Sequence, residues 1–242
     1  MKKILALSLL LYGCATTWPV PPAFIQQDIK TTDFEIRTYQ KNHSMTQPVH
    51  IYIEGDGHAF NARGTPTHNP TPQNTFLRNL AISDIHPNVA YIARPCQYNM
   101  SDKCTQSDWT DGRFSQKIID NISQTIKQIA QNRPLILIGY SGGALLSGLI
   151  IQQNPDINVQ EWITIAGVLN HNDWTSYFGD KPLNKSIDLY TLPHVQQKHY
   201  IAEKDSVVPY ELSQKWTNNN LIVIPNATHN NFPNIKINFS NH

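Results

Sequence analysis

The chain alternates short apolar or β-branched runs with segments whose apolar residues recur at helical spacing. Helices are predicted at 74–83, 114–131, 144–151 and 210–217, and the second of them carries isoleucines at a 3.6-residue period. Strands are predicted at 34–39, 49–53, 89–93, 135–138, 162–166, 198–202 and 221–225. The connection at about 170–192 shows no clear period and is expected to be irregular. This alternation indicates an α/β fold with a doubly wound, mostly parallel sheet and helices on both faces.

The two ends of the chain differ in character from the middle. Residues 1–13 combine two lysines with an apolar run too short to span a bilayer, as a signal peptide does. Residues 14–32 are predicted to be a tether, because proline is frequent in their first half. Residues 33–242 are predicted to be one domain with at most a small cap, and a chain of 242 residues requires no second domain.

Composition narrows the classes of partner. Charged residues make up 15% of the chain, the formal net charge is +1, and no basic block occurs, so we expect no nucleic-acid partner. The sequence has no zinc-protease motif, no P-loop and no dinucleotide-binding fingerprint. We therefore expect no metal and no cofactor.

The leader ends in Leu11-Tyr12-Gly13-Cys14, which resembles the lipobox of bacterial lipoproteins. The resemblance implies that Cys14 is lipidated and attaches the protein to a membrane of the bacterial cell envelope. Ala15 after the cysteine resembles outer-membrane lipoproteins, although Tyr12 is unusual at its position. The alternative is an ordinary secretory signal cut nearby, which would leave the protein periplasmic or secreted.

The chain has three cysteines, an odd number for an exported protein. A thioether at Cys14 would leave Cys96 and Cys104 to form a disulfide, which an oxidising compartment permits. Two free thiols in a cytosolic protein are the alternative, and the leader argues against it.

The pentapeptide Gly139-Tyr140-Ser141-Gly142-Gly143 lies between a predicted buried strand and a predicted buried helix. A G-x-S-x-G sequence in that context is the signature of a nucleophile elbow, a strained turn that exposes the serine hydroxyl. Ser141 is therefore the candidate nucleophile. A structural Gly-Ser turn is the alternative.

A serine nucleophile needs a base, and the base needs an orienting carboxylate. Asp205 follows the strand predicted at 198–202, and His229 follows the last strand, so both lie where open α/β sheets place their sites. Glu203 is the alternative acid, because Asp205 could instead cap a helix. His194 and His199 are alternatives to His229, but neither follows the last strand.

The chain order Ser, Asp, His resembles the α/β-hydrolase superfamily over residues 33–235, with K-D-x-V-V-P as its acid loop and A-T-H as its histidine loop. The resemblance implies an oxyanion hole made by the N–H of Gly142 and that of Asp56 or Gly57. Glu54 stands where that family usually has histidine. The segments Y-I-E-G-D-G, A-R-P-C-Q-Y and W-T-x-x-R-F-S further resemble bacterial lipoprotein-like α/β-hydrolases.

These motifs predict a serine hydrolase that cleaves an ester or related acyl bond of a small-molecule substrate through an acyl-enzyme. The alternative is a non-catalytic surface-binding lipoprotein on the same scaffold, which Glu54 keeps open. Several further side chains could either line the site or serve only as structure: His58, Trp109, Arg113, Phe114, Trp174, Tyr177 and Phe178.

Overall fold

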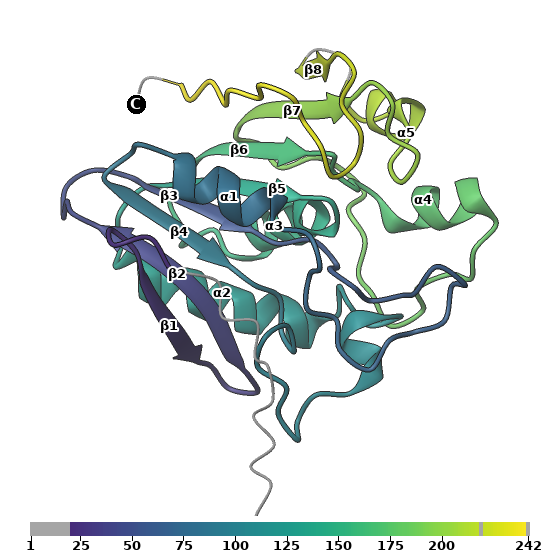
Figure 1. Ribbon diagram of the computed structural model, residues 1–242, viewed down its shortest axis with the longest axis horizontal. Helices are drawn as coiled ribbons and strands as arrows, with labels where there is room; N and C mark the ends of the chain where they lie inside the picture. Colours follow the sequence, from purple (N-terminus) through teal and green to yellow (C-terminus); the bar gives the residue numbers. More distant parts are fainter. Residues whose placement is uncertain (1–19, 218–219, 241–242) are drawn as a thin grey trace, which may run out of the picture.

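The computed structural model describes residues 20–217 and 220–240, which are built around an eight-stranded sheet (Figure 1). The strand order is β1-β2-β4-β3-β5-β6-β7-β8. In chain order the strands are β1 (Ile25–Lys30), β2 (Glu35–Asn42), β3 (Val49–Ile53), β4 (Asn88–Ile92), β5 (Leu135–Tyr140), β6 (Val159–Ile165), β7 (Gln196–Ala202) and β8 (Leu221–Ile224). The helices are α1 (Phe76–Ser83), the 3-10 turn η1 (Gln106–Trp109), α2 (Gln116–Ala130), α3 (Gly142–Gln153), α4 (His171–Phe178) and α5 (Tyr210–Gln214).

The sheet is mostly parallel, as predicted. Strands β3 to β8 pair in parallel, whereas β1 and β2 form an antiparallel hairpin and β2 pairs antiparallel with β4. Every residue of β3, β4 and β5 is buried, which explains their nearly continuous apolar sequences. Parallel strands end at the same edge, so the loops after β3, β5, β7 and β8 meet there.

One face of the sheet is covered by α2 and α3. The buried residues of α2 recur at the 3.6-residue spacing found in the sequence: Ile118, Ile119, Ile122, Ile126 and Ile129. Helix α3 is apolar around its whole circumference and packs against β5 and β6 while also touching α2. A helix that is apolar on every side is a buried one, and α3 lies at the centre of this layer.

The opposite face is covered by α1 and by the extended C-terminal segment 232–240, which lie on the same side of the sheet in Figure 1. Helix α1 contributes Leu77 and Ala81, and the segment contributes Phe232 and three half-buried apolar residues. Helices on both faces were predicted, and this is confirmed. The second face nevertheless has a short helix and an extended chain where the first has two long helices.

Two predictions of organisation are wrong. Residues 25–30 fall in the predicted tether 14–32 but form β1, whose residues pair with β2 from Ile25 opposite Gln40 to Lys30 opposite Glu35. The connection predicted to be irregular contains α4, which Asn170 caps by accepting a hydrogen bond from the N–H of Asp173 at 2.8 Å. The predicted signal peptide 1–13 and Cys14 lie outside the described residues. Within the described residues, no helix combines the length and apolarity needed to cross a bilayer.

Candidate active site

Ser141 occupies a sharp turn between β5 and α3. Its backbone has φ 51° and ψ −123°, a combination that costs free energy for any residue with a side chain. The two outer glycines of the motif allow strand and helix to approach closely. A methyl group on Gly143 would lie 2.3 Å from the carbonyl oxygen of Ile53, and one on Gly139 would lie 2.5 Å from that of Gly143. The pattern G-x-S-x-G is therefore a packing requirement of this turn.

The structure brings Ser141, His229 and Asp205 into one chain of hydrogen bonds. Nε2 of His229 lies 3.0 Å from Oγ of Ser141. Nδ1 of His229 lies 2.9 Å from Oδ2 and 3.1 Å from Oδ1 of Asp205. These residues follow β5, β8 and β7 and are 24 to 88 positions apart along the chain. The geometry suits transfer of the serine proton to an imidazole held by a buried carboxylate.

Asp205 is held rigidly beneath the imidazole. Its side chain is 1% exposed, and Oδ1 accepts hydrogen bonds from the N–H groups of Val207 at 2.8 Å and Val208 at 2.9 Å. It does not cap a helix, because α5 begins at Tyr210 after Pro209. Its short turn therefore fixes the carboxylate for contact with His229.

The alternative residues are engaged elsewhere. Glu203 accepts a hydrogen bond from the N–H of Asn226 at the surface. His194 is exposed, and His199 is buried in β7, where Nδ1 lies 2.8 Å from Oγ1 of Thr164. Burial lowers the pKa of His199 to about 4, so its imidazole is neutral at pH 7. His58 is half-buried, and its backbone N–H donates to the carbonyl of Pro70 at 2.9 Å.

The loop after β3 lies against the serine. A methyl group on Gly55 would be 2.9 Å from Cβ of Ser141, whereas one on Gly57 would strike the carbonyl oxygen of Pro70 at 2.1 Å. Glu54, the departure from the usual motif, accepts hydrogen bonds from the N–H of Gly55 at 2.9 Å and the hydroxyl of Tyr91 at 2.7 Å. Burial raises the pKa of Glu54, and these two hydrogen bonds oppose the rise only in part.

Two backbone N–H groups beside the serine are unused. Among the described residues, neither the N–H of Asp56 nor that of Gly142 makes a hydrogen bond to another residue. The carboxylate of Asp56 is held between Arg94, at 3.2 Å, and Arg113, at 2.9 Å. It sits directly over Gly142, where an added methyl group would be 2.1 Å from Oδ1. The sequence analysis singled out Asp56 and considered Arg113, in the loop after η1, but it did not consider Arg94, in the loop after β4.

A cavity of about 280 Å³ opens at this edge of the sheet. Ser141, His229 and Asp56 line it together with Arg113, Phe114 and Trp174, but Trp109 does not, and its indole N–H donates to the carbonyl of Thr67 instead. Tyr177 and Phe178 are 54% and 42% exposed on α4. Of the three aromatic residues of α4 that the sequence analysis considered for the site, only Trp174 lines this cavity. His171, also in its wall, was not anticipated from the sequence.

The remaining predicted sites are partly visible. Cys96 and Cys104 form the predicted disulfide, near the loop that holds Arg94. Within residues 20–217 and 220–240, no cluster of three or more His, Cys, Asp or Glu side chains could hold a metal ion.

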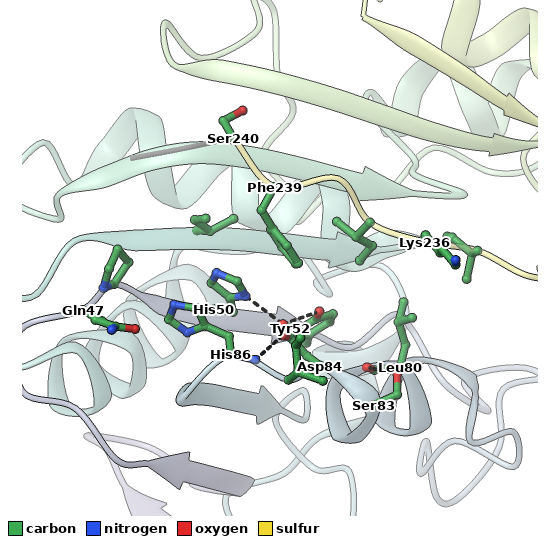
Figure 2. A pocket seen from close by; sticks show the side chains of 15 residues that line it. Gln47, His50, Tyr52, Leu80, Ser83, Asp84, His86, Lys236, Phe239 and Ser240 are labelled. Atoms are coloured by element: carbon green, nitrogen blue, oxygen red, sulfur yellow. Dashed lines mark hydrogen bonds and ion pairs between the residues drawn. The ribbon is translucent and has the colours of Figure 1, made fainter.

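A second, larger cavity of about 930 Å³ lies between α1 and the C-terminal segment (Figure 2). His50, at the start of β3, lies 2.7 Å from Asp84, which also accepts a hydrogen bond from the hydroxyl of Tyr52 at 2.9 Å. The ring of His50 stacks on that of His86 with 3.9 Å between centroids. None of the predicted site residues lines this cavity.

Comparison with solved structures places this architecture among known ones. A serine hydrolase homologue from Coxiella burnetii superposes with a TM-score of 0.56 at 13% identity, covering 88% of this chain and 92% of that one. A lid-less α/β serine hydrolase from Xanthomonas campestris gives 0.53 at 14% identity, covering 86% and 87%. A serine hydrolase from the polyaromatic-hydrocarbon-degrading Cycloclasticus zankles gives 0.55 at 11% identity, covering 85% and 91%.

The chain has the α/β-hydrolase fold. The resemblance expected from the motifs is therefore confirmed at the level of architecture. No protein-family model and no curated protein sequence matches the chain. In this fold, Ser141 occupies the sharp turn from β5 into α3, and Asp205 and His229 follow it after β7 and β8.

Proposed function

We propose that this protein is a serine hydrolase that cleaves an ester or related acyl bond through Ser141, His229 and Asp205. The observation that carries the proposal is the unbroken chain of hydrogen bonds from Oγ of Ser141 through the imidazole to a carboxylate that is 1% exposed. The strained backbone of Ser141 supports it, because strain of this kind is retained where it serves a site.

In the proposed reaction, Nε2 of His229 takes the proton of Ser141 as Oγ attacks the acyl carbonyl. Asp205 keeps Nδ1 protonated, orients the ring and stabilises its positive charge. His229 then gives the proton to the leaving alcohol, and the acyl group remains on Oγ. Water attacks this acyl-enzyme with His229 again as base, which releases the acid and restores the serine.

The N–H groups of Gly142 and Asp56 are proposed to stabilise the oxyanion of each tetrahedral intermediate. Asp56 is preferred to Gly57 because Gly55 lies against Ser141, whereas Gly57 lies against Pro70. Loss of one such donor typically lowers kcat by about 10² to 10³-fold. The cavity of about 280 Å³ is near the lower end of the range of ligand pockets, about 300–1,000 Å³, and this favours short acyl substrates.

The test is replacement of Ser141 by alanine. The native protein should hydrolyse short acyl esters and be labelled at Ser141 by a fluorophosphonate. Ser141→Ala should lose the label and about 10⁴-fold or more in kcat, at unchanged thermal stability. A variant that keeps more than a tenth of the native rate would remove Ser141 from the mechanism.

We also propose that the protein is exported and attached to the cell envelope, in an outer membrane, by a lipid at Cys14. The lipobox-like leader supports this, and so does the disulfide between Cys96 and Cys104, because disulfides persist in oxidising compartments. Mass analysis of the mature N-terminus should find diacylglyceryl and acyl groups on Cys14. A mature chain that starts at another residue without lipid would exclude the anchor.

A further inference from the structure

Two polar side chains in the wall of the active-site cavity have no part in the proposed mechanism. The side chain of His171, the first residue of α4, is 3% exposed, and neither ring nitrogen makes a well-aligned hydrogen bond to any described residue. The nearest carboxylate oxygen, Oδ2 of Asp188, is 3.7 Å from Nδ1. A buried polar group left without a partner destabilises the fold, so its retention needs a reason.

Arg113 is the second of these side chains. It is 5% exposed, and Nε lies 2.9 Å from Oδ2 of Asp56 without the alignment of a hydrogen bond. The one further polar contact of its guanidinium among the described residues is a long one, 3.4 Å from NH1 to the carbonyl of Thr110. Asp56 also pairs with Arg94, so one carboxylate serves two guanidinium groups.

The other acids near this cluster are already engaged. Glu54 binds the hydroxyl of Tyr91 and the N–H of Gly55. Asp188 accepts hydrogen bonds from the N–H groups of His171 and Asn172 at the start of α4, each at 2.9 Å, and from that of Leu189 at 3.0 Å. Arg113 therefore keeps unused hydrogen-bond donors beside the cavity that Ser141 lines.

We propose that Arg113 and His171 form a subsite for a carboxylate, or a similar oxyanion, carried by the ester substrate. The inference rests on the proposed function and adds the substrate class: short esters that bear a negative charge. Arg113 binds the anion through its guanidinium, and His171 donates one N–H to it.

The surroundings of Arg113 suit this role. The rings of Phe60, Phe114 and Trp174 lie 5.5–5.8 Å from its guanidinium carbon, and all three line the same cavity. Aromatic walls exclude water, which strengthens a charge-assisted hydrogen bond. Burial lowers the pKa of His171, with the Arg113 charge adding to the effect and Asp188 and the Ser186 backbone opposing it in part. The imidazole is therefore neutral at pH 7 and has one N–H to donate.

The cavity volume limits how far the anion lies from the reacting carbonyl. Both side chains share a space of about 280 Å³ with Ser141, so the charge must lie within a few bonds of the scissile ester. The negative charge can belong to the acyl group of the ester or to its alcohol. Two pairs of esters distinguish these sources: monomethyl glutarate against methyl pentanoate, and 4-acetoxybenzoate against 4-acetoxybenzamide.

We expect kcat/KM for the anionic member of one pair to exceed that of its neutral partner by about ten- to a hundred-fold. Arg113→Gln should abolish this preference, Arg113→Lys should restore part of it, and His171→Leu should reduce it. Arg94→Gln is the matched control, because Arg94 also pairs with Asp56 but does not line the cavity. The ratio of the two rates should stay unchanged in this variant, even where both rates fall.

The two proposals fail in different ways. If the neutral esters are hydrolysed and Ser141 is labelled, but no anionic ester is preferred, the subsite is wrong and the hydrolase stands. If neither hydrolysis nor labelling occurs, the hydrolase is wrong. The subsite is then judged by calorimetry, in which glutarate or benzoate should bind Ser141→Ala at least tenfold more tightly than Ser141→Ala/Arg113→Gln. Equal binding to both proteins, or none to either, overturns it.

Discussion

Replacement of Gly142 by alanine tests the geometry of the oxyanion loop, because it keeps the backbone N–H that is proposed to bind the oxyanion. The added methyl group would lie 2.1 Å from Oδ1 of Asp56, whereas real contacts of this kind stay above 3.0 Å. Something must therefore move by at least 0.9 Å, the difference between these two distances. The carboxylate is pinned by Arg94 and Arg113, so we expect the loop that bears the Asp56 N–H to move with it.

A displacement of about 1 Å in a catalytic group costs about 10²-fold in rate, and loss of an oxyanion donor costs about 10² to 10³-fold. Gly142→Ala should therefore lower kcat for a neutral acetate ester by about 10² to 10³-fold, with little change in KM. Steady-state kinetics on the purified mature domain measures this, and thermal unfolding checks that the fold survives. Gly64→Ala is the control for kcat, which should stay unchanged because a methyl group there meets nothing within 4 Å. The φ of +71° at Gly64 strains any side chain, so this variant should lose some thermal stability.

A double variant isolates the cause of the loss. Asp56→Ala removes the side chain that Gly142→Ala would strike but keeps the Asp56 N–H, so the double variant should be no slower than Asp56→Ala alone. Losses that simply add would show that the contact between methyl group and carboxylate is not responsible. A folded Gly142→Ala protein with more than a third of the native kcat would refute the reasoning altogether.

Three further outcomes are expected. Asp205→Asn should lower kcat about 10⁴-fold in ester hydrolysis, because the amide favours the wrong tautomer of the imidazole, and a loss below tenfold would contradict the relay. Replacing Cys96 and Cys104 by serine should lower the free energy of unfolding in urea by about 2–3 kcal/mol, because the disulfide no longer restricts a short loop of the unfolded chain. An unchanged transition midpoint would show that the disulfide does not stabilise the fold. Burial alone would raise the pKa of Glu161, but Lys198 and the C-terminal segment lower it below its ordinary value of 4.5. The contribution of Glu161 to stability is therefore complete above pH 4.5 and is lost as pH falls through its folded-state pKa. Glu161→Gln should make the free energy of unfolding fall less steeply with pH in acid. An equally steep fall would disprove this role of Glu161.

The elements that the sequence predicted well are those whose signal is local. The strand predicted at 49–53 matches β3, and the helix predicted at 114–131 contains α2, because burial on both faces or on one stripe leaves a regular apolar pattern. Strand β1 escaped detection because only Ile29 among its six residues is buried. It forms through backbone pairing with β2, which leaves no pattern in its own side chains.

In the candidate site, too, residues with a local sequence signal were predicted and those placed by distant parts of the chain were not. Ser141, Asp205 and His229 could be selected because each follows a strand in a known order, and strand ends meet at one edge. Arg113 was considered, but whether it lined the site or anchored a loop could not be decided, because that depends on the path of the loop between η1 and α2. His171 was missed with α4 itself, although Asn170 and Gly179 at its two ends are residues typical of helix caps.

The position of β1 shortens the distance available to a lipid at Cys14. Were residues 14–32 all tether, a fully extended chain would span roughly 60 Å, but Val20 already packs against the domain, and six residue steps reach only about 20 Å. With the proposed anchor at Cys14, the domain would therefore lie directly on the lipid headgroups and could not move freely above them.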